Sequence, residues 1–347
     1  MATPPTGAPP TPPASPDDAQ KSAAKTQSTP IYMAVLNELN LNADQFAKRT
    51  NLINEIETAL TARYGARNRL IAYILRFGHA RTSMHTADIV NLETVLNSIT
   101  GAEQINLLLH APGGDGTIVE KMVEMCRAHL SGNNRVLRVI VPNIAKSAAT
   151  VLALGADKIV MGYCSELGPI DPQVLMAAYG MTQWVSAFAF VEARDKLMMQ
   201  IAEATKKKEP TTGLLQQLAG LNIPFTDEME NQIGFAKKTA VTLLSKYMLR
   251  PGYPKKVARE KKAKQIAEAL LSKQLFPVHG HYIDAATAQG LGIEIEVLGQ
   301  DDSLWQQIWN YYIRCEIQMN IPLQPGQIKT KLFESGNQVS LVFQDAP

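Results

Sequence analysis

The sequence has few of the residues that form disulfide bonds and zinc sites, and it lacks long apolar runs. Its 347 residues include three cysteines, Cys126, Cys164 and Cys315, and no CxxC motif. Scattered cysteines are typical of a reducing compartment, so we expect a cytoplasmic protein without disulfide bonds or zinc. No apolar run approaches the roughly 20 residues that cross a bilayer, so we also expect no membrane segment.

An excess of charge of one sign is lacking as well. The formal net charge is +2, which gives no general attraction to nucleic acid, and we expect none as a partner. Hydrophobic residues make up 46% of the chain, enough to bury a sizeable core. Residues 1–30 differ, because they are rich in Pro, Ala, Thr and Ser and contain no aromatic residue. We expect a disordered tail there, without the apolar core of a signal peptide.

The most informative stretch covers residues 105–170, in which apolar runs alternate with helical patterns. Residues 105–110, 135–141 and 157–161 are short apolar runs, typical of strands that are buried on both faces. Helical patterns follow the first two runs, one after a Pro-Gly-Gly turn and one after Ser147. This alternation predicts right-handed βαβ units and a parallel sheet.

Gly113, Gly114 and Ser147 stand where predicted strands end and helices begin. Backbone N–H groups at such positions lack helical partners and lie at the positive end of a helix dipole. Neighbouring strand ends meet at one edge of a parallel sheet. One end could therefore supply N–H donors for an oxyanion, and the other a hydroxyl beside the N–H of Ala148. A plain turn and a helix-capping serine would explain the same residues.

Four segments carry a resemblance to a known family: LLLHAPGGDG, AKSAAT, SELGPIDPQ and HGHYIDAATAQGLGI. In this order they resemble the Clp protease/crotonase superfold and, more narrowly, the serine dehydrogenase proteinase family, relatives of signal peptide peptidase A. The resemblance covers residues 70–174 and resumes at residues 276–297. It implies an α/β, Clp/crotonase-like fold and a serine peptidase that acts on peptides or proteins. The acyl-enzyme would form on Ser147, with an oxyanion hole at Gly113, Gly114 and Ala148.

The resemblance also implies a catalytic triad in the order serine, aspartate, histidine. No histidine occurs between His129 and His279, which excludes the order of the Clp proteases, where the loop after the third strand supplies the histidine. That loop carries Asp171 here, and two flanking prolines hold its backbone extended. We therefore expect Ser147 as the nucleophile, Asp171 as the orienting acid and His279 as the base.

Two other bases stay open. His281 would share a face with His279 if this stretch is extended. Lys196 lies beyond Ser147 at nearly the spacing of the lysine base in signal peptide peptidase A, although its charged neighbours favour a solvated helix face. An H-x-H pair can also bind a metal, but no third ligand stands nearby in the sequence. We therefore expect no metal and no cofactor.

Alternative functions also stay open. A crotonase-type acyl-CoA enzyme would share the oxyanion hole but would need no serine nucleophile. A non-catalytic assembly module would keep only the fold. The charged Lys146 before the serine, and Ala149 where relatives often have glycine, leave an inactive member of the family open.

The rest of the chain divides around this stretch. Residues 31–66 have helical periodicity and predict a helical arm. We expect the peptidase domain at residues 67–300, with a helical segment at 184–272 that could pack subunits into a homo-oligomer. A helix and a hairpin are expected at residues 301–347. Six Lys and Arg residues between 255 and 264 could contact phosphates, although a solvated amphipathic helix explains them as well.

Overall fold

The computed structural model describes residues 30–41, 44–78, 82–178, 181–321 and 326–345. The chain forms two units, residues 1–43 and residues 44–347, and the first contributes a single described helix, α2 (Ile31–Asn40). The disordered tail expected at residues 1–30 lies outside the described residues, apart from Pro30.

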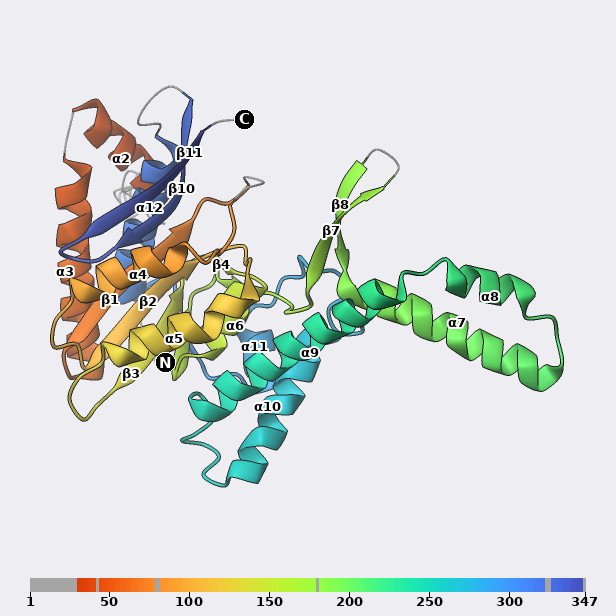
Figure 1. Cartoon of the computed structure of the whole chain (residues 1–347). Coiled ribbons are helices and arrows are strands. Elements are labelled where there is room, and N and C mark those ends of the chain that lie inside the picture. Colours follow the sequence, from red (N-terminus) through yellow and green to blue (C-terminus); the bar gives the residue numbers. More distant parts are fainter. Residues whose placement is uncertain (1–29, 42–43, 79–81, 179–180, 322–325, 346–347) are drawn as a thin grey trace, which may run out of the picture. The chain divides into compact units, whose positions relative to one another are not determined.

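A seven-stranded sheet organises this unit, in the order β11-β10-β1-β2-β3-β5-β9 (Figure 1). Its five consecutive parallel strands confirm the parallel sheet predicted from the apolar runs. The parallel strands are β1 (Asn68–Leu75), β2 (Gln104–His110), β3 (Val136–Val141), β5 (Lys158–Met161) and β9 (Ile295–Val297). The antiparallel hairpin β10 (Gln327–Glu334) and β11 (Val339–Asp345) continues the same sheet beyond β1.

Helices cover both faces of the sheet, and alternate residues of each strand serve the two sides. In β1, Leu70 and Ile74 join the core under α3 (Gln45–Tyr64) and α12 (Ser303–Asn320). Ile71 and Leu75 join the opposite core. The helices of that second layer are α4 (Asp88–Asn97), α5 (Val119–Ala128), which follows the short 3-10 turn η1 (Gly116–Ile118), and α6 (Ala148–Leu154).

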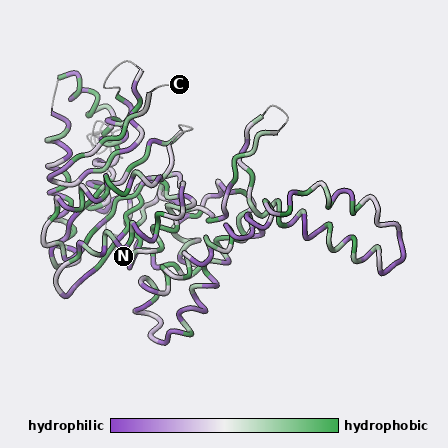
Figure 2. The backbone as a smooth tube through the Cα atoms, viewed as in Figure 1, coloured by the Kyte–Doolittle hydropathy of each residue, from purple (hydrophilic) through white to green (hydrophobic). Residues whose placement is uncertain are grey.

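Figure 2 shows the hydropathy of each residue along the chain trace. Strands β1, β2, β3 and β5 are almost entirely buried. Burial on both faces explains why the strands read as continuous apolar runs in the sequence. Residues 31–66, where we expected a helical arm, contain α2 in the first unit and α3 in the second. The Asp44 side chain caps α3 by accepting a hydrogen bond from the N–H of Ala47 at 3.0 Å. The expected C-terminal helix and hairpin are α12 and β10–β11.

The segment after β5 differs from expectation at its start. A short parallel pair, β4 (Ile144–Ala145) and β6 (Glu166–Leu167), precedes the hairpin β7 (Gln173–Ala178) and β8 (Met181–Ser186). Trp184, where we expected helix, therefore lies in β8. It stands opposite Leu175 across the hairpin, and such cross-strand pairs of large apolar residues stabilise a strand over a helix.

Helices follow from Ala187 onward. They are α7 (Ala187–Lys207), α8 (Thr212–Ala219), α9 (Ile223–Lys246), α10 (Lys256–Leu271) and α11 (Ala285–Leu291). Helix α9 packs against α7, α10 and α6, and so connects the helical segment to the layer over the sheet. None of the described helices is long and apolar enough to span a membrane.

A buried ion pair joins three of these elements. Arg49 of α3 donates from Nε to Oε2 of Glu334 in β10 at 2.9 Å and from Nη2 to Oε1 at 2.9 Å. The hydroxyl of Tyr311 in α12 donates to Oε2 at 2.8 Å. The Arg49 and Glu334 side chains are 3% and 0% exposed, so each charge depends on the other for its solvation.

Glu334→Gln tests this dependence. The substitution keeps the shape but leaves the Arg49 guanidinium buried without a counter-charge, so we expect the free energy of unfolding to fall by about 3–5 kcal/mol. Chemical denaturation measures the change. The matched control is Glu268→Gln, which removes an exposed pair with Lys237 and should cost about 1 kcal/mol or less. Equal losses in the two variants would contradict the account.

Candidate active site

The Pro-Gly-Gly turn after β2 lies directly against Ser147. A Cβ placed on Gly113 would stand 2.7 Å from Ser147 Cβ and 2.9 Å from the carbonyl oxygen of Lys146. Gly113 also has a φ of 108°, in a region that favours glycine. Hydrogen bonds between the two segments hold the approach, since the N–H of Lys146 donates to Ala111 at 3.0 Å. The two strand ends therefore meet, as parallel strand ends do.

Gly114 is fixed by a second segment. The Met84 N–H donates to the carbonyl of Gly113 at 2.8 Å, and the Asp115 N–H donates to the carbonyl of Met84 at 3.0 Å. A Cβ on Gly114 would collide with the Met84 backbone. Within the described part of the chain, the N–H groups of Gly114 and Ala148 have no hydrogen-bond partner. Both are thus available to an oxygen placed beside Ser147.

Ser147 has a strained backbone. Its φ of 51° and ψ of −121° are rare for a residue with a side chain, and such conformations cost about 1–3 kcal/mol. Ser147 occupies the N-cap position of α6, but its hydroxyl makes no capping hydrogen bond. Helix capping therefore does not explain the residue. A sharp strand-to-helix turn of this kind is how α/β-hydrolases expose a nucleophilic serine.

Asp171 and His279 are brought together from positions 108 residues apart. The Nδ1 of His279 lies 2.7 Å from Oδ1 of Asp171. Asp171 is 6% exposed, and its other oxygen, Oδ2, accepts hydrogen bonds from Gln173 Nε2 at 2.7 Å and Ser186 Oγ at 2.9 Å. Gln173 and Ser186 pair across the base of the β7–β8 hairpin. Both oxygens of the carboxylate are therefore fixed.

Sequence reasoning missed Gln173 and Ser186. Gln173 stood in the quoted segment SELGPIDPQ, but neither residue carried a role. Only the hairpin pairing places both of them on one carboxylate oxygen, and that pairing was not expected.

The charge on Asp171 follows from these contacts. Burial raises the pKa of this carboxyl, but the hydrogen bonds from His279, Ser186 and Gln173 together outweigh burial and bring the pKa below its usual 3.8. An ionised carboxylate can only accept hydrogen bonds, so Nδ1 of His279 carries the proton in this contact. The other ring nitrogen, Nε2, is then left as the basic one.

Ser147 and His279 are not joined directly. Within the described residues, no hydrogen bond connects the Ser147 hydroxyl to the His279 ring. Catalytic hydrogen bonds are often long in unliganded enzymes and shorten only in the substrate complex. The side chain of Lys146 nevertheless links the chain segments that carry these two residues.

Lys146 connects the serine to the other two segments of the site. Its Nζ lies 2.8 Å from Glu166 Oε2 and donates to the carbonyl of Leu167 at 3.1 Å and to that of His281 at 2.9 Å. A Cβ on Gly168 would stand 2.6 Å from the lysine Cδ, so this glycine leaves space for the side chain. The charge before the serine is thus neutralised rather than aimed at the hydroxyl.

The other two candidate bases lie in different surroundings. The His281 ring packs against Phe276 with centroids 5.2 Å apart. The backbone N–H of His281 donates to the carbonyl of Val278 at 2.9 Å, which forms a turn at residues 278–281. The stretch is therefore not extended, and the two histidines do not share a face as they would in a strand. Lys196 is exposed on α7, without the burial that a lysine base needs. No group of three potential metal ligands occurs in the described part of the chain.

The contacts of Asp171 predict a pH dependence of stability. A carboxyl with a lowered folded-state pKa stabilises the fold above its usual pKa of 3.8, and this contribution disappears as the pH falls through the folded-state value. Wild type should therefore be more stable than Asp171→Asn at pH 7, and the gap should narrow below about pH 4. Chemical denaturation at pH 7, 5 and 3 measures this difference in the free energy of unfolding. Asp301→Asn, at an exposed position, is the control and should show no such convergence. A gap independent of pH would contradict the prediction.

Sequence comparisons identify relatives of this chain. A model of ClpP-like SDH-type serine proteinases matches residues 33–212, slightly more than half of the chain. The uncharacterized protein MJ0137 of Methanocaldococcus jannaschii is 39% identical over 85 residues, which are 24% of this chain and 28% of that protein. MJ1495 of the same organism is 34% identical over 70 residues, 20% of this chain and 23% of that protein. The match thus spans about a quarter of each relative.

Two solved structures show a looser likeness. A serine-to-alanine variant of the 1510-N membrane-bound stomatin-specific protease has a TM-score of 0.36 and 13% identity, covering 65% of this chain and 79% of its own. A lysine-to-alanine variant of the same protease, in complex with a substrate peptide, has a TM-score of 0.28 and 13% identity, covering 67% and 95%. The family match over residues 33–212 carries the assignment: this chain belongs to the ClpP-like SDH-type serine proteinase family.

Proposed function

We propose that this chain is a serine peptidase that acts through an acyl-enzyme on Ser147. The observation that carries the proposal is the 2.7 Å contact between His279 Nδ1 and Asp171 Oδ1. A carboxylate on Nδ1 orients the imidazole and stabilises the imidazolium that forms when Nε2 takes a proton. Ser147 in a strained turn supplies the nucleophile, beside two N–H groups that have no partner among the described residues.

The reaction follows from these groups. Nε2 of His279 accepts the hydroxyl proton of Ser147 while Oγ attacks the carbonyl carbon of the scissile bond. The carbonyl oxygen becomes an oxyanion and accepts hydrogen bonds from the N–H groups of Gly114 and Ala148, with Gly113 leaving the space open. Losing one such donor typically costs about 10²–10³ in rate. The imidazolium then gives its proton to the leaving amine, and water hydrolyses the acyl-enzyme by the same steps in reverse.

The proposal requires that Ser147 and His279 approach to hydrogen-bond distance when substrate binds. The Asp171–His279 pair favours a peptidase over a crotonase-type acyl-CoA enzyme, because a crotonase oxyanion hole needs no charge-stabilised imidazole beside a serine. Peptides or proteins are the substrates that the family suggests. Assembly into a homo-oligomer and a cytoplasmic location stay predictions.

Labelling with a fluorophosphonate probe tests the triad. Ser147→Ala should abolish labelling, because the probe reacts with the activated hydroxyl. Asp171→Asn and His279→Ala should slow it by roughly 10³-fold or more, since the hydroxyl loses its base or the base loses its orientation. The controls are His281→Ala and Lys196→Ala, which should label at nearly the wild-type rate.

Two outcomes would replace the proposal. Normal labelling of His279→Ala together with loss in Lys196→Ala would assign the base to the lysine. No labelling of folded wild-type protein would favour the non-catalytic assembly module.

Lys146 is a positioning residue in this scheme, and a separate pair of variants tests it. Lys146→Met removes the contacts to Glu166, Leu167 and His281. The turn at residues 278–281 then loses its link to the segment that carries Ser147. We expect labelling to slow by about 10²-fold, the effect of a small misplacement of reacting groups. Lys146→Arg keeps the charge and several donors and should retain more of the rate. The control is Lys237→Met, on an exposed pair. Equal labelling in Lys146→Met and wild type would remove the positioning role.

A further inference from the structure

A hollow of about 470 Å³ lies between helices α9 and α10, on elements that contribute none of the proposed catalytic residues. Its volume falls within the roughly 300–1,000 Å³ that is typical of small-molecule sites. Helix α9 contributes its last turns and α10 its first two to three. The lining residues are Val241, Thr242, Ser245, Lys246, Lys256, Arg259, Glu260 and Lys264.

Positive charge dominates this hollow. Four of its lining residues are cations, Lys246, Lys256, Arg259 and Lys264, and one, Glu260, is an anion. A cleft lined mainly by one sign of charge focuses the field and concentrates ions of the opposite sign. The chain as a whole carries a net charge of only +2, so the concentration of cations is local.

The ion pairs among the described residues neutralise only part of this positive charge. Lys246 is paired with Glu124 at 2.6 Å, but Lys256 and Glu260 stand 3.8 Å apart. Lys264 is exposed and has no ion-pair partner among the residues that the structure describes. Exposed pairs of this kind contribute little, so Lys256 and Lys264 can turn to a ligand at small cost.

Two polar atoms of the hollow are buried without a hydrogen-bond partner. They are the hydroxyl oxygen of Ser245 and the Nε of Arg259. The guanidinium is already fixed, because Nη1 donates to the carbonyl of Tyr253 at 3.0 Å. Buried donors are nearly always satisfied, and an anionic oxygen is an acceptor that suits each of these groups.

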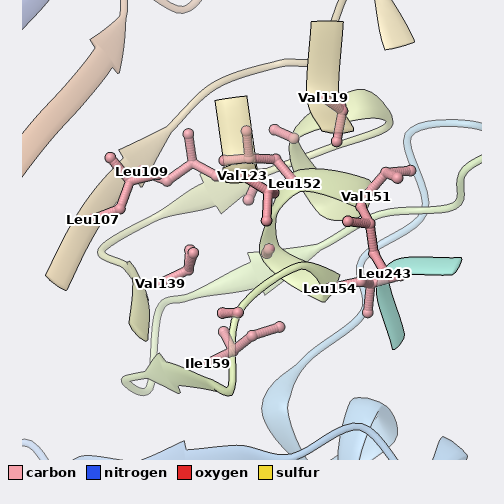
Figure 3. Close-up of a cluster of buried hydrophobic side chains, with 14 of the residues drawn as sticks. Leu107, Leu109, Val119, Val123, Val139, Val151, Leu152, Leu154, Ile159 and Leu243 are labelled. Carbon is pink, nitrogen blue, oxygen red and sulfur yellow. The ribbon is translucent and has the colours of Figure 1, made fainter. Parts of the chain in front are cut away.

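We infer that this groove binds a small phosphate-bearing anion. The guanidinium of Arg259 and the hydroxyl of Ser245 would donate to phosphate oxygens, and Lys256 and Lys264 would supply charge from α10. Such a ligand bridges α9 and α10. Helix α9 in turn packs on α6, where Leu243 lies beside Val151 and Leu154 (Figure 3). The ligand would therefore stabilise the layer that holds the helix after Ser147.

Calorimetric titration of the full chain with inorganic triphosphate and with ATP tests the inference. We expect saturable binding of triphosphate, weakened about tenfold or more in Arg259→Gln and in Lys264→Gln, because each loses a charge-assisted contact. Since Arg259 also holds the Tyr253 carbonyl, Lys264→Gln is the decisive variant. The matched control is Lys261→Gln, which removes the same charge from α10 at an exposed position outside the hollow.

The outcomes separate clearly. Equal affinity for triphosphate and ATP would assign the site to phosphate groups alone, and tighter binding of ATP would add a nucleoside contact. Loss of affinity in Lys264→Gln but not in Lys261→Gln supports a defined site. Equal losses in both variants would mean diffuse attraction to a basic helix and would overturn the inference. So would the absence of saturable binding by wild type.

Discussion

No side chain can stand at residue 113, and much of the site depends on this constraint. Gly113 lies where a Cβ would meet Ser147 Cβ at 2.7 Å, so the turn after β2 and the serine after β3 can close on each other. Because β2 and β3 are neighbouring parallel strands, the two segments leave the sheet at the same edge. The bridge between Ala111 and Ala145 then holds them. Any substitution at Gly113 would force the glycine turn or the serine segment to shift.

The groups around Ser147 differ in how fully they are hydrogen-bonded. The half-buried Lys146 has several partners, as does the buried Glu334 elsewhere in the chain, and both oxygens of Asp171 are occupied. By contrast, the hydroxyl of Ser147 makes no cap, and the N–H of Ala148 has no partner in the described part of the chain. Strain at Ser147 falls at the same place. A serine in a strained backbone conformation, next to an N–H group left without a partner in the described residues, is a place that a substrate can engage.

The local features of this fold could be predicted because they depend on residues that are close together in the sequence. Apolar runs predicted β2, β3 and β5, and the Pro-Gly-Gly turn predicted a free strand end. The hairpin at 173–186 escaped because its stabilising pairs, such as Leu175 with Trp184, form between strands. The contact of Ser186 with Asp171 was not predicted because the two residues are distant in the sequence. The contact of Lys146 with the His281 carbonyl was not predicted because a backbone carbonyl is not indicated by any residue type.

The family match ends at residue 212, so it includes Ser147 and Asp171 but not His279. The case for the histidine therefore depends on how the chain returns to the site. Ile283 pairs with Leu167 in an antiparallel bridge, which fixes the segment after the histidine turn beside the loop before Asp171. The carbonyl of His281 accepts from Lys146, which fixes the turn beside the serine. The bridge at Ile283, the Lys146 contact at His281 and the Asp171 contact at 2.7 Å together hold the His279 segment. Lys196 on α7 is exposed and makes no such contact among the residues that the structure describes, so we favour His279 as the base.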